Sequence, residues 1–301
     1  MGGFIAMPIF KGSGVALITP FKDEESVDFE ALGRLVDFHL EHKTDAIIVC
    51  GTTGEPSTMP DDEHLEVIRF VIDRVAGRKP VIAGVGSNHT KHAVYLSKKA
   101  QELGADGLLH VTPYYNKTTQ KGLIEHFKEI NDAVSIPIIV YNVPSRTGLN
   151  ILPETVKELS KLPNIRAIKE ASGNITQVAE IAMLCPDIDI YSGNDDQIVP
   201  VLSVGGIGVI SVLANILPDE THDIVEYFLN GQVEKAKELQ LKLLPIIKAL
   251  FIEVNPIPVK EAMNMMGFNV GKPRLPLTTM TEKNREILKK ALIDYGIAIK
   301  E

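Results

Sequence analysis

The sequence predicts an α/β protein, a (β/α)8 TIM barrel followed by a small C-terminal helical domain. From about residue 14, a short apolar run is followed by an amphipathic stretch, and this alternation occurs eight times. Parallel strands alternating with helices produce such a pattern, and eight units in succession close into a barrel. The chain has 301 residues, whereas a barrel alone often takes about 250. We therefore expect a barrel over residues 1–231, with a short N-terminal extension, and a helical domain over residues 232–301.

Each expected strand is a short apolar run that ends in polar residues. The expected strands are 15–19, 46–49, 81–84, 107–110, 138–141, 165–169, 188–191 and 208–211. Between them, amphipathic spacing predicts helices over 28–42, 62–76, 90–103, 120–131, 153–161 and 174–184. Asp28 and Thr90 are expected to cap their helices, and Pro153 and Pro218 suit a first helical turn. After the barrel, we expect helices over 232–251 and 281–295, and a rigid proline-rich turn over 255–260.

The composition argues against several classes of function. The formal net charge is -8, so the chain lacks the basic surplus that nucleic acids and anionic membranes attract. Its two cysteines, Cys50 and Cys185, make neither a disulfide framework nor a zinc motif. The uncharged stretch 198–218 is long enough to span a bilayer, but its prolines and glycines predict a short helix, a turn and a buried strand. The first ten residues lack the basic region of a secretory signal, so we expect a cytoplasmic protein with no nucleic-acid or membrane partner.

Lys169 ends an apolar run, where an ammonium group has no evident structural use. Burial disfavours the charged form, so a lysine at the mouth of a water-poor cavity can attack a carbonyl and form an imine. Tyr141 ends the preceding expected strand. Because adjacent strands lie about 4.8 Å apart, a phenol and an amine at matching depth would contact one bound carbonyl compound. The alternative for Tyr141 is an interface tyrosine with a satisfied hydroxyl.

Loops at the carboxyl ends of barrel strands supply the other candidates, because barrel active sites lie there. The loop 51–54, Gly-Thr-Thr-Gly, can offer backbone N–H groups and two hydroxyls to a small anion, although such a loop by itself is more often a tight turn. Arg146 has a planar fork that suits a carboxylate, with a solvated loop arginine as the equal alternative. Tyr114 and Tyr115 follow the fourth strand, where packing beneath a loop is the alternative. The seventh and eighth strands add Gly193 and Ile210.

Five motifs carry a resemblance to a known family. They are Gly-Thr-Thr-Gly-Glu at 51–55, Thr-Pro-Tyr-Tyr-Asn at 112–116, Tyr-Asn-Val-Pro-Ser-Arg-Thr-Gly at 141–148, Ile-Lys-Glu-Ala-Ser-Gly-Asn at 168–174 and Asn-Pro-Ile-Pro-Val-Lys at 255–260. In this order and spacing the chain resembles the dihydrodipicolinate synthase (4-hydroxy-tetrahydrodipicolinate synthase) family, of the Schiff-base pyruvate lyase and aldolase superfamily. The resemblance runs almost end to end, and only residues 1–8 look like an extension.

The resemblance implies a lyase that condenses pyruvate with L-aspartate 4-semialdehyde to 4-hydroxy-tetrahydrodipicolinate, on the route to diaminopimelate and lysine. It implies that Lys169 forms a covalent imine with pyruvate, without a cofactor or a metal. It also implies that Tyr141 shuttles protons through Thr52 to Tyr115. In the family this last tyrosine crosses into a neighbouring subunit's site, so the resemblance implies a homotetramer, a dimer of two tight dimers.

The substrate-binding residues follow from the same resemblance. It implies that Thr53 and its loop hold the pyruvate carboxylate, that Ile210 provides a backbone contact, and that Arg146 receives the semialdehyde. Gly193 is expected to join this substrate-binding set.

Three alternatives remain open at this point. N-acetylneuraminate lyase and 2-keto-3-deoxy sugar-acid aldolases share the lysine and the tyrosine, but Thr52 and Arg146 favour a short dicarboxylate-like substrate. A metal-dependent barrel aldolase would use His110, Glu170 and Asp195 at poor ligand spacing, and Asp195 is better suited to cap the following helix. A dinucleotide-binding turn at 84–89 lacks the third glycine of the motif.

One departure from the family yields a prediction about regulation. Some family members are inhibited by lysine, which binds in a cleft lined by a Ser, two His, an Asn, a Glu and a Tyr. The positions that match these six residues, in chain order, are Pro56, Asp61, His64, Asn88, His92 and Tyr114. The change from Glu to His92 removes the counter-charge for an effector's ammonium, so lysine should inhibit weakly or not at all. A titration of activity with lysine measures this, and inhibition at sub-millimolar lysine would contradict it.

Overall fold

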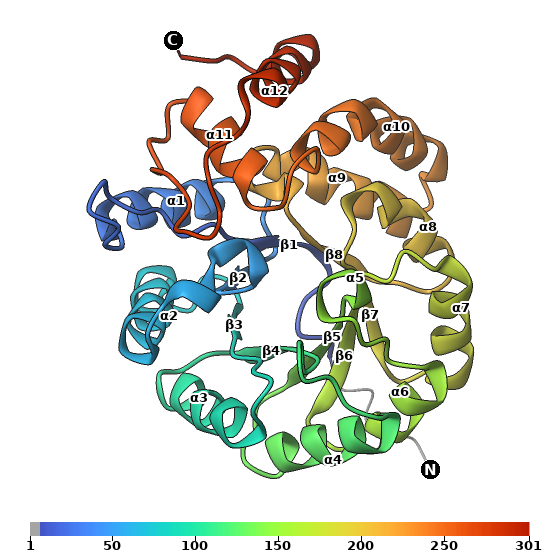
Figure 1. Cartoon of the computed structure of the whole chain (residues 1–301). Coiled ribbons are helices and arrows are strands. Elements are labelled where there is room, and N and C mark those ends of the chain that lie inside the picture. The colour runs from blue at the N-terminus through green and yellow to red at the C-terminus, as the bar shows by residue number, and fades with distance from the viewer. Residues whose placement is uncertain (1–6, 301) are drawn as a thin grey trace.

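The computed structural model describes residues 7–300 and has a closed barrel of eight parallel strands at its centre. The strands follow each other around the barrel in chain order, and β1 pairs with both β2 and β8 (Figure 1). They are β1 (Gly12–Ala16), β2 (Ala46–Val49), β3 (Val81–Gly84), β4 (Gly107–Val111), β5 (Ile138–Asn142), β6 (Ile165–Glu170), β7 (Asp189–Ser192) and β8 (Gly208–Ser211). The predicted (β/α)8 architecture is confirmed.

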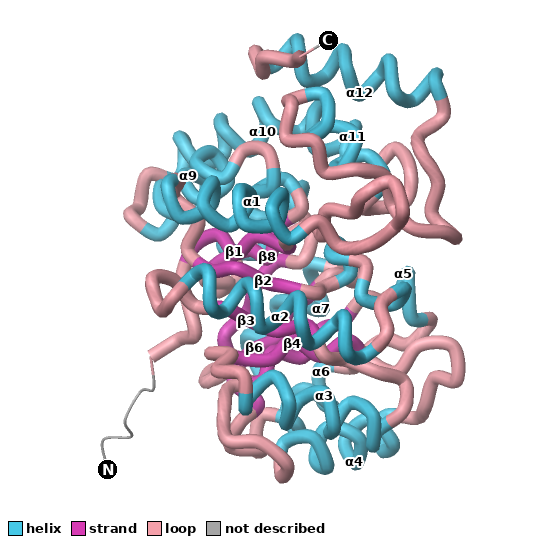
Figure 2. Tube along the Cα trace, turned by 90° about the vertical axis from the view of Figure 1, so that its left-hand side faces the viewer, coloured by secondary structure: helices cyan, strands magenta, loops and turns pink. Residues whose placement is uncertain are grey.

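Helices enclose the strands (Figure 2). They are α1 (Phe29–Glu41), α2 (Asp61–Val75), α3 (Thr90–Glu102), α4 (Gln120–Asn131), α5 (Pro144–Thr147), α6 (Pro153–Leu159), α7 (Ile175–Leu184), α8 (Ile198–Ser203) and α9 (Pro218–Leu229). Asp28 caps α1, because its carboxylate accepts a hydrogen bond from the Ala31 N–H at 3.0 Å. The predicted cap at Thr90 is wrong: Thr90 is the first residue of α3, and its hydroxyl pairs with the His126 ring instead.

The first strand begins earlier than hydrophobicity indicates. It spans Gly12–Ala16 rather than 15–19, and the buried residues Leu17 and Ile18 follow it in a loop. Small residues are needed in β1 because its neighbours approach closely: a Cβ on Gly14 would lie 2.5 Å from Ile48 Cδ1. A strand made of glycine and serine carries no strong apolar pattern, so the apolar residues beyond it give the stronger signal.

Two layers of apolar side chains lie on the two faces of the barrel sheet. Outward-facing residues pack against the helices, and inward-facing residues fill the barrel. Within the barrel, Phe10 stacks on Tyr191 with ring centroids 4.3 Å apart, and the Tyr191 hydroxyl donates to the Phe10 carbonyl at 2.7 Å. Because Phe10 lies two residues before β1, this pair fills the amino-terminal end of the barrel.

The chain beyond α9 forms three further helices, one more than predicted. α10 (Val233–Leu250) packs on α9, and α12 (Glu282–Tyr295) packs on both α10 and α11 (Ile257–Met265). α12 is the outermost of the three (Figure 2). The proline-rich turn predicted over 255–260 is wrong beyond Pro256, because α11 begins at Ile257. Proline is accepted at the first turn of a helix, where no N–H partner is required, so Pro258 fits the first turn of α11.

The uncharged stretch 198–218 contains α8, a turn at residues 204–205 and β8, as predicted. In the described part of the chain, no helix combines the length and apolar character needed to cross a membrane. The predicted N-terminal extension covers residues 1–8, and residues 1–6 lie outside the described part of the chain. Met7, within the described part, is exposed.

His110, on β4, is a fully buried histidine held in its neutral form. The Ser97 hydroxyl donates to the Ala93 carbonyl, so it accepts the hydrogen bond from His110 Nε2–H at 3.0 Å. The other ring nitrogen, Nδ1, has no partner among the described residues. Protonation would place an unpaired N–H⁺ in an apolar interior. Burial accordingly lowers the pKa of His110 to about 3.

We predict that His110 makes the protein less stable in acid. Its folded-state pKa of about 3 lies below its unfolded value of 6.5, so the unfolded chain binds the extra proton first. The free energy of unfolding therefore falls as the pH drops from 6.5 toward 3. The loss is about 2 kcal/mol at pH 5 for this side chain alone.

Urea unfolding midpoints at pH 7 and pH 5 measure this effect in the wild type and in His110→Gln. The wild type should lose more stability in acid than the variant. His222→Gln is the matched control, since the hydrogen bond to Asp45 raises the pKa of His222. A raised pKa gives stability that is present in acid and lost as the pH rises, so this control should lose at least as much in acid as the wild type. Equal pH dependence of the wild type and His110→Gln would contradict the prediction.

Candidate active site

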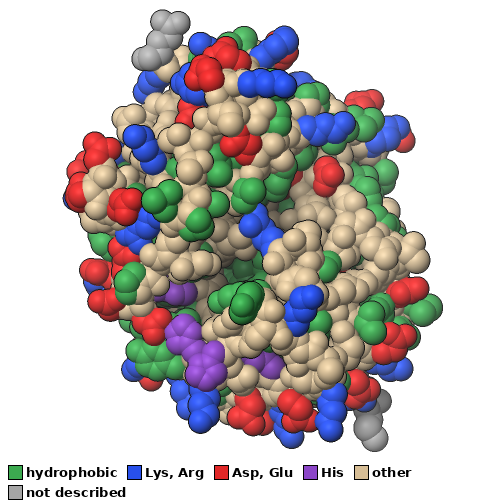
Figure 3. Space-filling model, viewed as in Figure 1, with side chains coloured by type: hydrophobic (Ala, Val, Ile, Leu, Met, Phe, Trp, Pro, Cys, Tyr) green, Lys and Arg blue, Asp and Glu red, His purple; other side chains and the backbone are tan. Residues whose placement is uncertain are grey.

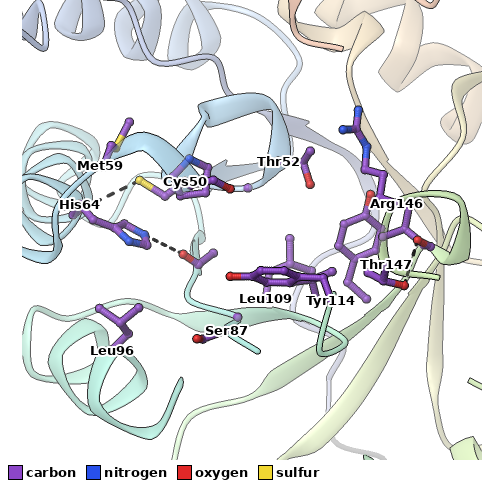
Figure 4. A pocket seen from close by; sticks show the side chains of 18 of the residues that line it. Cys50, Thr52, Met59, His64, Ser87, Leu96, Leu109, Tyr114, Arg146 and Thr147 are labelled. Carbon is purple, nitrogen blue, oxygen red and sulfur yellow. Dashed lines mark hydrogen bonds between the residues drawn. The ribbon is translucent and has the colours of Figure 1, made fainter. Parts of the chain in front are cut away.

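A cavity of about 380 Å³ opens at the carboxyl ends of β2 to β5. Its lining includes Thr52 after β2, Leu109 on β4, Tyr114 after β4, Tyr141 on β5 and Arg146 on α5. The space-filling view shows a hollow near the centre of this face (Figure 3), and the close-up shows Thr52, Tyr114 and Arg146 around the cavity (Figure 4). The position agrees with the rule that barrel enzymes act at the carboxyl ends of their strands.

Lys169 and Tyr141 occupy directly paired positions on β6 and β5. Each has only 6% of its surface exposed. The Lys169 Nζ lies 4.2 Å from the centroid of the Tyr141 ring, over the face of that ring. The amine therefore lies against the face of a tyrosine that lines the cavity, with little water around either group.

A register shift in the sheet produces this pairing. Ile138 pairs with Ile165, but the next residue, Ile139, pairs with Ala167, so that Arg166 is the extra residue of a bulge. Without the bulge, Tyr141 would lie opposite Ile168 rather than Lys169. Strand alternation would then place the amine and the phenol on different faces of the sheet. Sequence reasoning missed this bulge, because Arg166 carries no turn or glycine signal.

Gly193, directly after β7, leaves room for the lysine stem. Its N–H donates to the Glu170 carbonyl at 2.8 Å, which ties the end of β7 to β6. A Cβ at this position would lie 2.6 Å from the Ala171 Cβ and 3.1 Å from the Lys169 Cε. A larger residue at 193 would therefore push against Lys169.

The end of β8 is fixed by a buried carboxylate. Asp195 Oδ2 accepts hydrogen bonds from the N–H groups of Val212 at 3.1 Å and Leu213 at 2.9 Å, just after Ile210. The Ile210 side chain is buried inside the barrel. Burial raises the pKa of Asp195, while its hydrogen bonds and the charge of Lys169 act in the opposite direction. The prediction that Asp195 caps the helix after it is wrong, because the side chain reaches across to the end of β8.

The loop after β2 is a 3₁₀ turn, η1 (Thr52–Gly54), whose two threonines have different environments. Thr52 lines the cavity. Thr53 is 2% exposed, and its hydroxyl accepts a hydrogen bond from Asn255 Nδ2 at 3.0 Å. Gly54 is held by its carbonyl, which accepts from the Thr19 hydroxyl at 2.7 Å. The loop is therefore pinned from the barrel and from the C-terminal helices at once.

Arg146 reaches the cavity from α5, a single helical turn between β5 and α6. One guanidinium nitrogen donates to the Asn255 carbonyl at 3.0 Å. Asn255 therefore contacts both Thr53 and Arg146, the two residues predicted to bind carboxylates. Sequence reasoning placed Asn255 in a motif without assigning it a role, since nothing in the sequence brings residue 255 to the barrel mouth.

The two tyrosines after β4 point in different directions. Tyr114 lines the cavity, whereas Tyr115 is 93% exposed and adopts a φ of +69°. Within one chain the structure brings Thr52 and Tyr141 to the same cavity, and it leaves Tyr115 outside. The predicted relay is therefore incomplete in a single chain.

Cys50 and His64 also line the cavity, but they are not arranged as a nucleophile and its base. His64 Nε2–H donates to the Gly84 carbonyl at 2.9 Å, and burial lowers the pKa of His64. The Cys50 thiol contacts the His64 carbonyl at 3.9 Å rather than the ring (Figure 4). Burial raises the pKa of this thiol, so it stays protonated and unreactive.

A network of amides behind the site holds a second buried carboxylate. Glu170, next to Lys169, is 3% exposed. Its Oε2 accepts from Asn142 at 2.9 Å and from Gln177 at 3.0 Å, and its Oε1 accepts from the Ser172 N–H at 2.6 Å. The residues after Tyr141 and after Lys169 are therefore linked on the face of the sheet away from the barrel interior. Asn142 and Glu170 each directly follow a residue of the candidate site, and side chains alternate along a strand. This alternation is the sequence signal that could have placed both of them on the outer face of the sheet.

The structure does not assemble the alternative sites. His110 is bonded to Ser97, Glu170 to amides and Asp195 to backbone N–H groups, so these three do not converge on a metal position. Among residues 7–300, the cluster close enough to hold a metal is His222, Asp223 and Glu226, which is a different set. In the candidate dinucleotide turn, a Cβ on Gly84 would lie 2.1 Å from the Cys50 carbonyl oxygen, so this glycine serves close packing of strands.

The fold and the site define a class first: a (β/α)8-barrel enzyme with a buried lysine and a tyrosine paired at the carboxyl ends of adjacent strands. A model of the dihydrodipicolinate synthetase family matches residues 9–294. The chain therefore belongs to the dihydrodipicolinate synthetase family.

Relatives agree over nearly the whole chain. A 4-hydroxy-tetrahydrodipicolinate synthase from Caldicellulosiruptor saccharolyticus is 99% identical over 295 residues, which cover 98% of this chain and 100% of the relative. The crystal structure of dihydrodipicolinate synthase from Aquifex aeolicus has a TM-score of 0.95 at 47% identity, covering 97% of this chain and 100% of that one. A chloride-inhibited dihydrodipicolinate synthase from Acinetobacter baumannii, complexed with pyruvate, has a TM-score of 0.93 at 42% identity, covering 95% and 99%.

We predict that Gly193→Ala impairs the reactivity of Lys169 without unfolding the barrel. The added methyl group would overlap the Ala171 side chain and crowd the lysine stem, which should shift the amine relative to the Tyr141 ring and slow imine formation with a small keto acid by about tenfold or more. Borohydride trapping followed by mass spectrometry measures this rate. Gly33→Ala is the control, because its Cβ would meet its nearest atom at 3.5 Å, an ordinary contact. Trapping by Gly193→Ala at the wild-type rate would contradict the steric role.

Proposed function

We propose that this chain condenses pyruvate with L-aspartate 4-semialdehyde through an imine on Lys169. The product would be 4-hydroxy-tetrahydrodipicolinate, on the route to diaminopimelate and lysine. The observation that carries the proposal is the direct pairing of a buried lysine with a tyrosine at the cavity edge. The substrate pair is supported by family membership and by the name of the 99% identical relative.

The reaction begins when the Lys169 amine attacks the keto carbon of pyruvate. Loss of water gives a protonated imine, which makes the neighbouring methyl group acidic. Removal of a methyl proton gives an enamine, whose terminal carbon bonds to the aldehyde carbon of the semialdehyde while the aldehyde oxygen takes a proton. The semialdehyde's amino group then attacks the imine carbon, closes the ring and expels the Lys169 amine.

Each of these steps moves a proton, and Tyr141 is the group placed to move it. Its phenol lies beside the lysine on the adjacent strand and is mostly shielded from water. Proton transfer by a positioned side chain contributes roughly 10² to 10⁴ in rate. We propose that Thr52, on the same cavity wall, carries protons onward from Tyr141 to Tyr115.

Tyr115 would complete that relay from a neighbouring subunit. It projects outward on a loop that is held firmly, since Asn116 donates to the Asn88 carbonyl at 2.9 Å and Asn88 donates to the Tyr114 carbonyl at 3.1 Å. A large aromatic side chain exposed on such a loop is suited to enter another chain's site. We therefore propose a homotetramer, assembled as two tight dimers.

The two substrate carboxylates need separate partners. We propose that Thr53 and the N–H groups of its turn hold the pyruvate carboxylate, because η1 presents backbone donors next to Thr52. Arg146 would receive the carboxylate of the semialdehyde with the part of its fork that Asn255 leaves free. Ile210 would contribute a backbone contact, and Gly193 would border the bound pyruvate beside Lys169.

We propose that the reaction uses no cofactor and no metal, since the imine itself stabilises the carbanion. We also propose a cytoplasmic location. This agrees with two buried cysteines, Cys50 and Cys185, that are not joined in a disulfide.

Trapping with pyruvate and borohydride tests the proposed function. We expect a reduced pyruvate adduct on Lys169, found by mass analysis of peptides, and turnover with aspartate semialdehyde but not with N-acetylneuraminate. Tyr141→Phe should still be trapped on Lys169 while kcat falls by roughly 10² or more, because the proton carrier is lost. An adduct on another residue, or none, would overturn the mechanism, and cleavage of N-acetylneuraminate would overturn the substrate assignment.

A further inference from the structure

We propose that the buried ion pair between Glu55 and Lys260 is a positioning device for the pyruvate-carboxylate loop. In this device the C-terminal helix α11 sets the place of Thr53 in the site. The inference rests on the proposed function of that loop, and it adds two residues that touch neither substrate.

Glu55 directly follows the loop but turns away from the cavity. Its backbone has a φ of +57°, in the left-handed region, and the residue is 4% exposed. One carboxylate oxygen lies 2.5 Å from the Lys260 Nζ, and the other accepts from the Arg274 N–H at 3.0 Å. Both of these partners belong to the C-terminal part of the chain.

Lys260 is buried as completely as a core leucine. It is 1% exposed, its Nζ lies 4.1 Å from the centroid of the Phe21 ring, and it donates weakly to the Lys272 carbonyl at 3.4 Å. Burial lowers the pKa of Lys260 to about 8, even though Glu55 acts to raise it. The ammonium therefore depends on Glu55, on the ring face and on one carbonyl, with no access to bulk water.

A pair buried in this way is a poor source of stability. Removing two charges from water is costly, and apolar residues of similar volume are often as stabilising or more so. What an ion pair provides is a fixed distance and direction between two elements. Here the elements are the end of η1 and the first turns of α11.

The same helix start holds both carboxylate-binding groups. Asn255 donates to the Thr53 hydroxyl and accepts from Arg146. The Lys260 N–H donates to the Pro256 carbonyl at 3.0 Å, so Lys260 lies one helical turn beyond that contact. The Glu55–Lys260 pair therefore locks α11 to the loop at a second point, and two points of attachment fix the loop's orientation as well as its distance.

Loss of the pair should loosen Thr53 and the backbone N–H groups of η1. The pyruvate carboxylate would then bind less tightly, so the KM for pyruvate should rise. Lys169 and Tyr141 are held by the β5–β6 register, so kcat at saturating pyruvate should change much less. This separation of KM from kcat is what distinguishes a positioning role from general damage.

The experiment uses Glu55→Gln, Lys260→Met and the double variant Glu55→Gln/Lys260→Met in the full-length enzyme. Each single variant leaves one buried group without its partner, so the melting temperature should fall. The double variant removes both charges and should recover most of that melting temperature. It should still have a KM for pyruvate raised by about tenfold, because the fixed link to the loop is gone.

Glu261→Gln is the matched control, because Glu261 follows Lys260 on α11 and pairs with Arg285 near the surface. It should leave both the KM and the melting temperature close to wild type. If the double variant regained the wild-type KM along with its stability, the pair would be purely structural and the inference would be overturned. A kcat loss without a KM change would also overturn it. Failure of the proposed function itself would appear separately, as absence of a pyruvate adduct in the wild type.

Discussion

The register between β5 and β6 is the constraint on which the site depends. A bulge at Arg166 shifts the pairing so that Tyr141 lies opposite Lys169, and the following pair is Asn142 and Glu170. Because side chains alternate, the amine and phenol face the barrel interior while the amide and carboxylate meet behind the sheet. Without the bulge, Ile168 rather than Lys169 would face the cavity beside Tyr141. The amide network around Glu170 therefore stabilises the same register that brings the two reactive groups together.

The C-terminal helices contribute to the site as directly as the barrel does. Asn255 contacts Thr53 and Arg146, and Lys260 pairs with Glu55, so α11 and the residue before its cap are joined to three side chains at the barrel mouth. A (β/α)8 barrel positions residues on strands accurately, but its loops are less constrained. The lysine and the tyrosine lie directly on paired strands. Thr53 and Arg146, which we propose to bind the substrate carboxylates, lie on short helical turns after β2 and β5, and Asn255, just before α11, contacts both.

Much of this could be predicted from the sequence, because the signals are local. The eight apolar runs gave the barrel, and the lysine at the end of one run gave the candidate nucleophile. The first strand begins at Gly12 rather than at the predicted residue 15, because the glycines that allow close approach of its neighbours carry no apolar pattern. The bulge at Arg166, the helix that begins at Ile257 and the contacts of Asn255 were not foreseen. Each depends on which distant segments meet, and neither spacing nor composition encodes that information.

A crystal structure of the enzyme soaked with pyruvate tests the proposed mechanism directly. We expect continuous density from the Lys169 Nζ to the keto carbon, with the carboxylate on the N–H groups and hydroxyl of the η1 turn and the Tyr141 phenol beside the imine nitrogen. Pyruvate bound away from Lys169, or attached to it with its carboxylate directed to a different loop, would contradict the proposed mechanism.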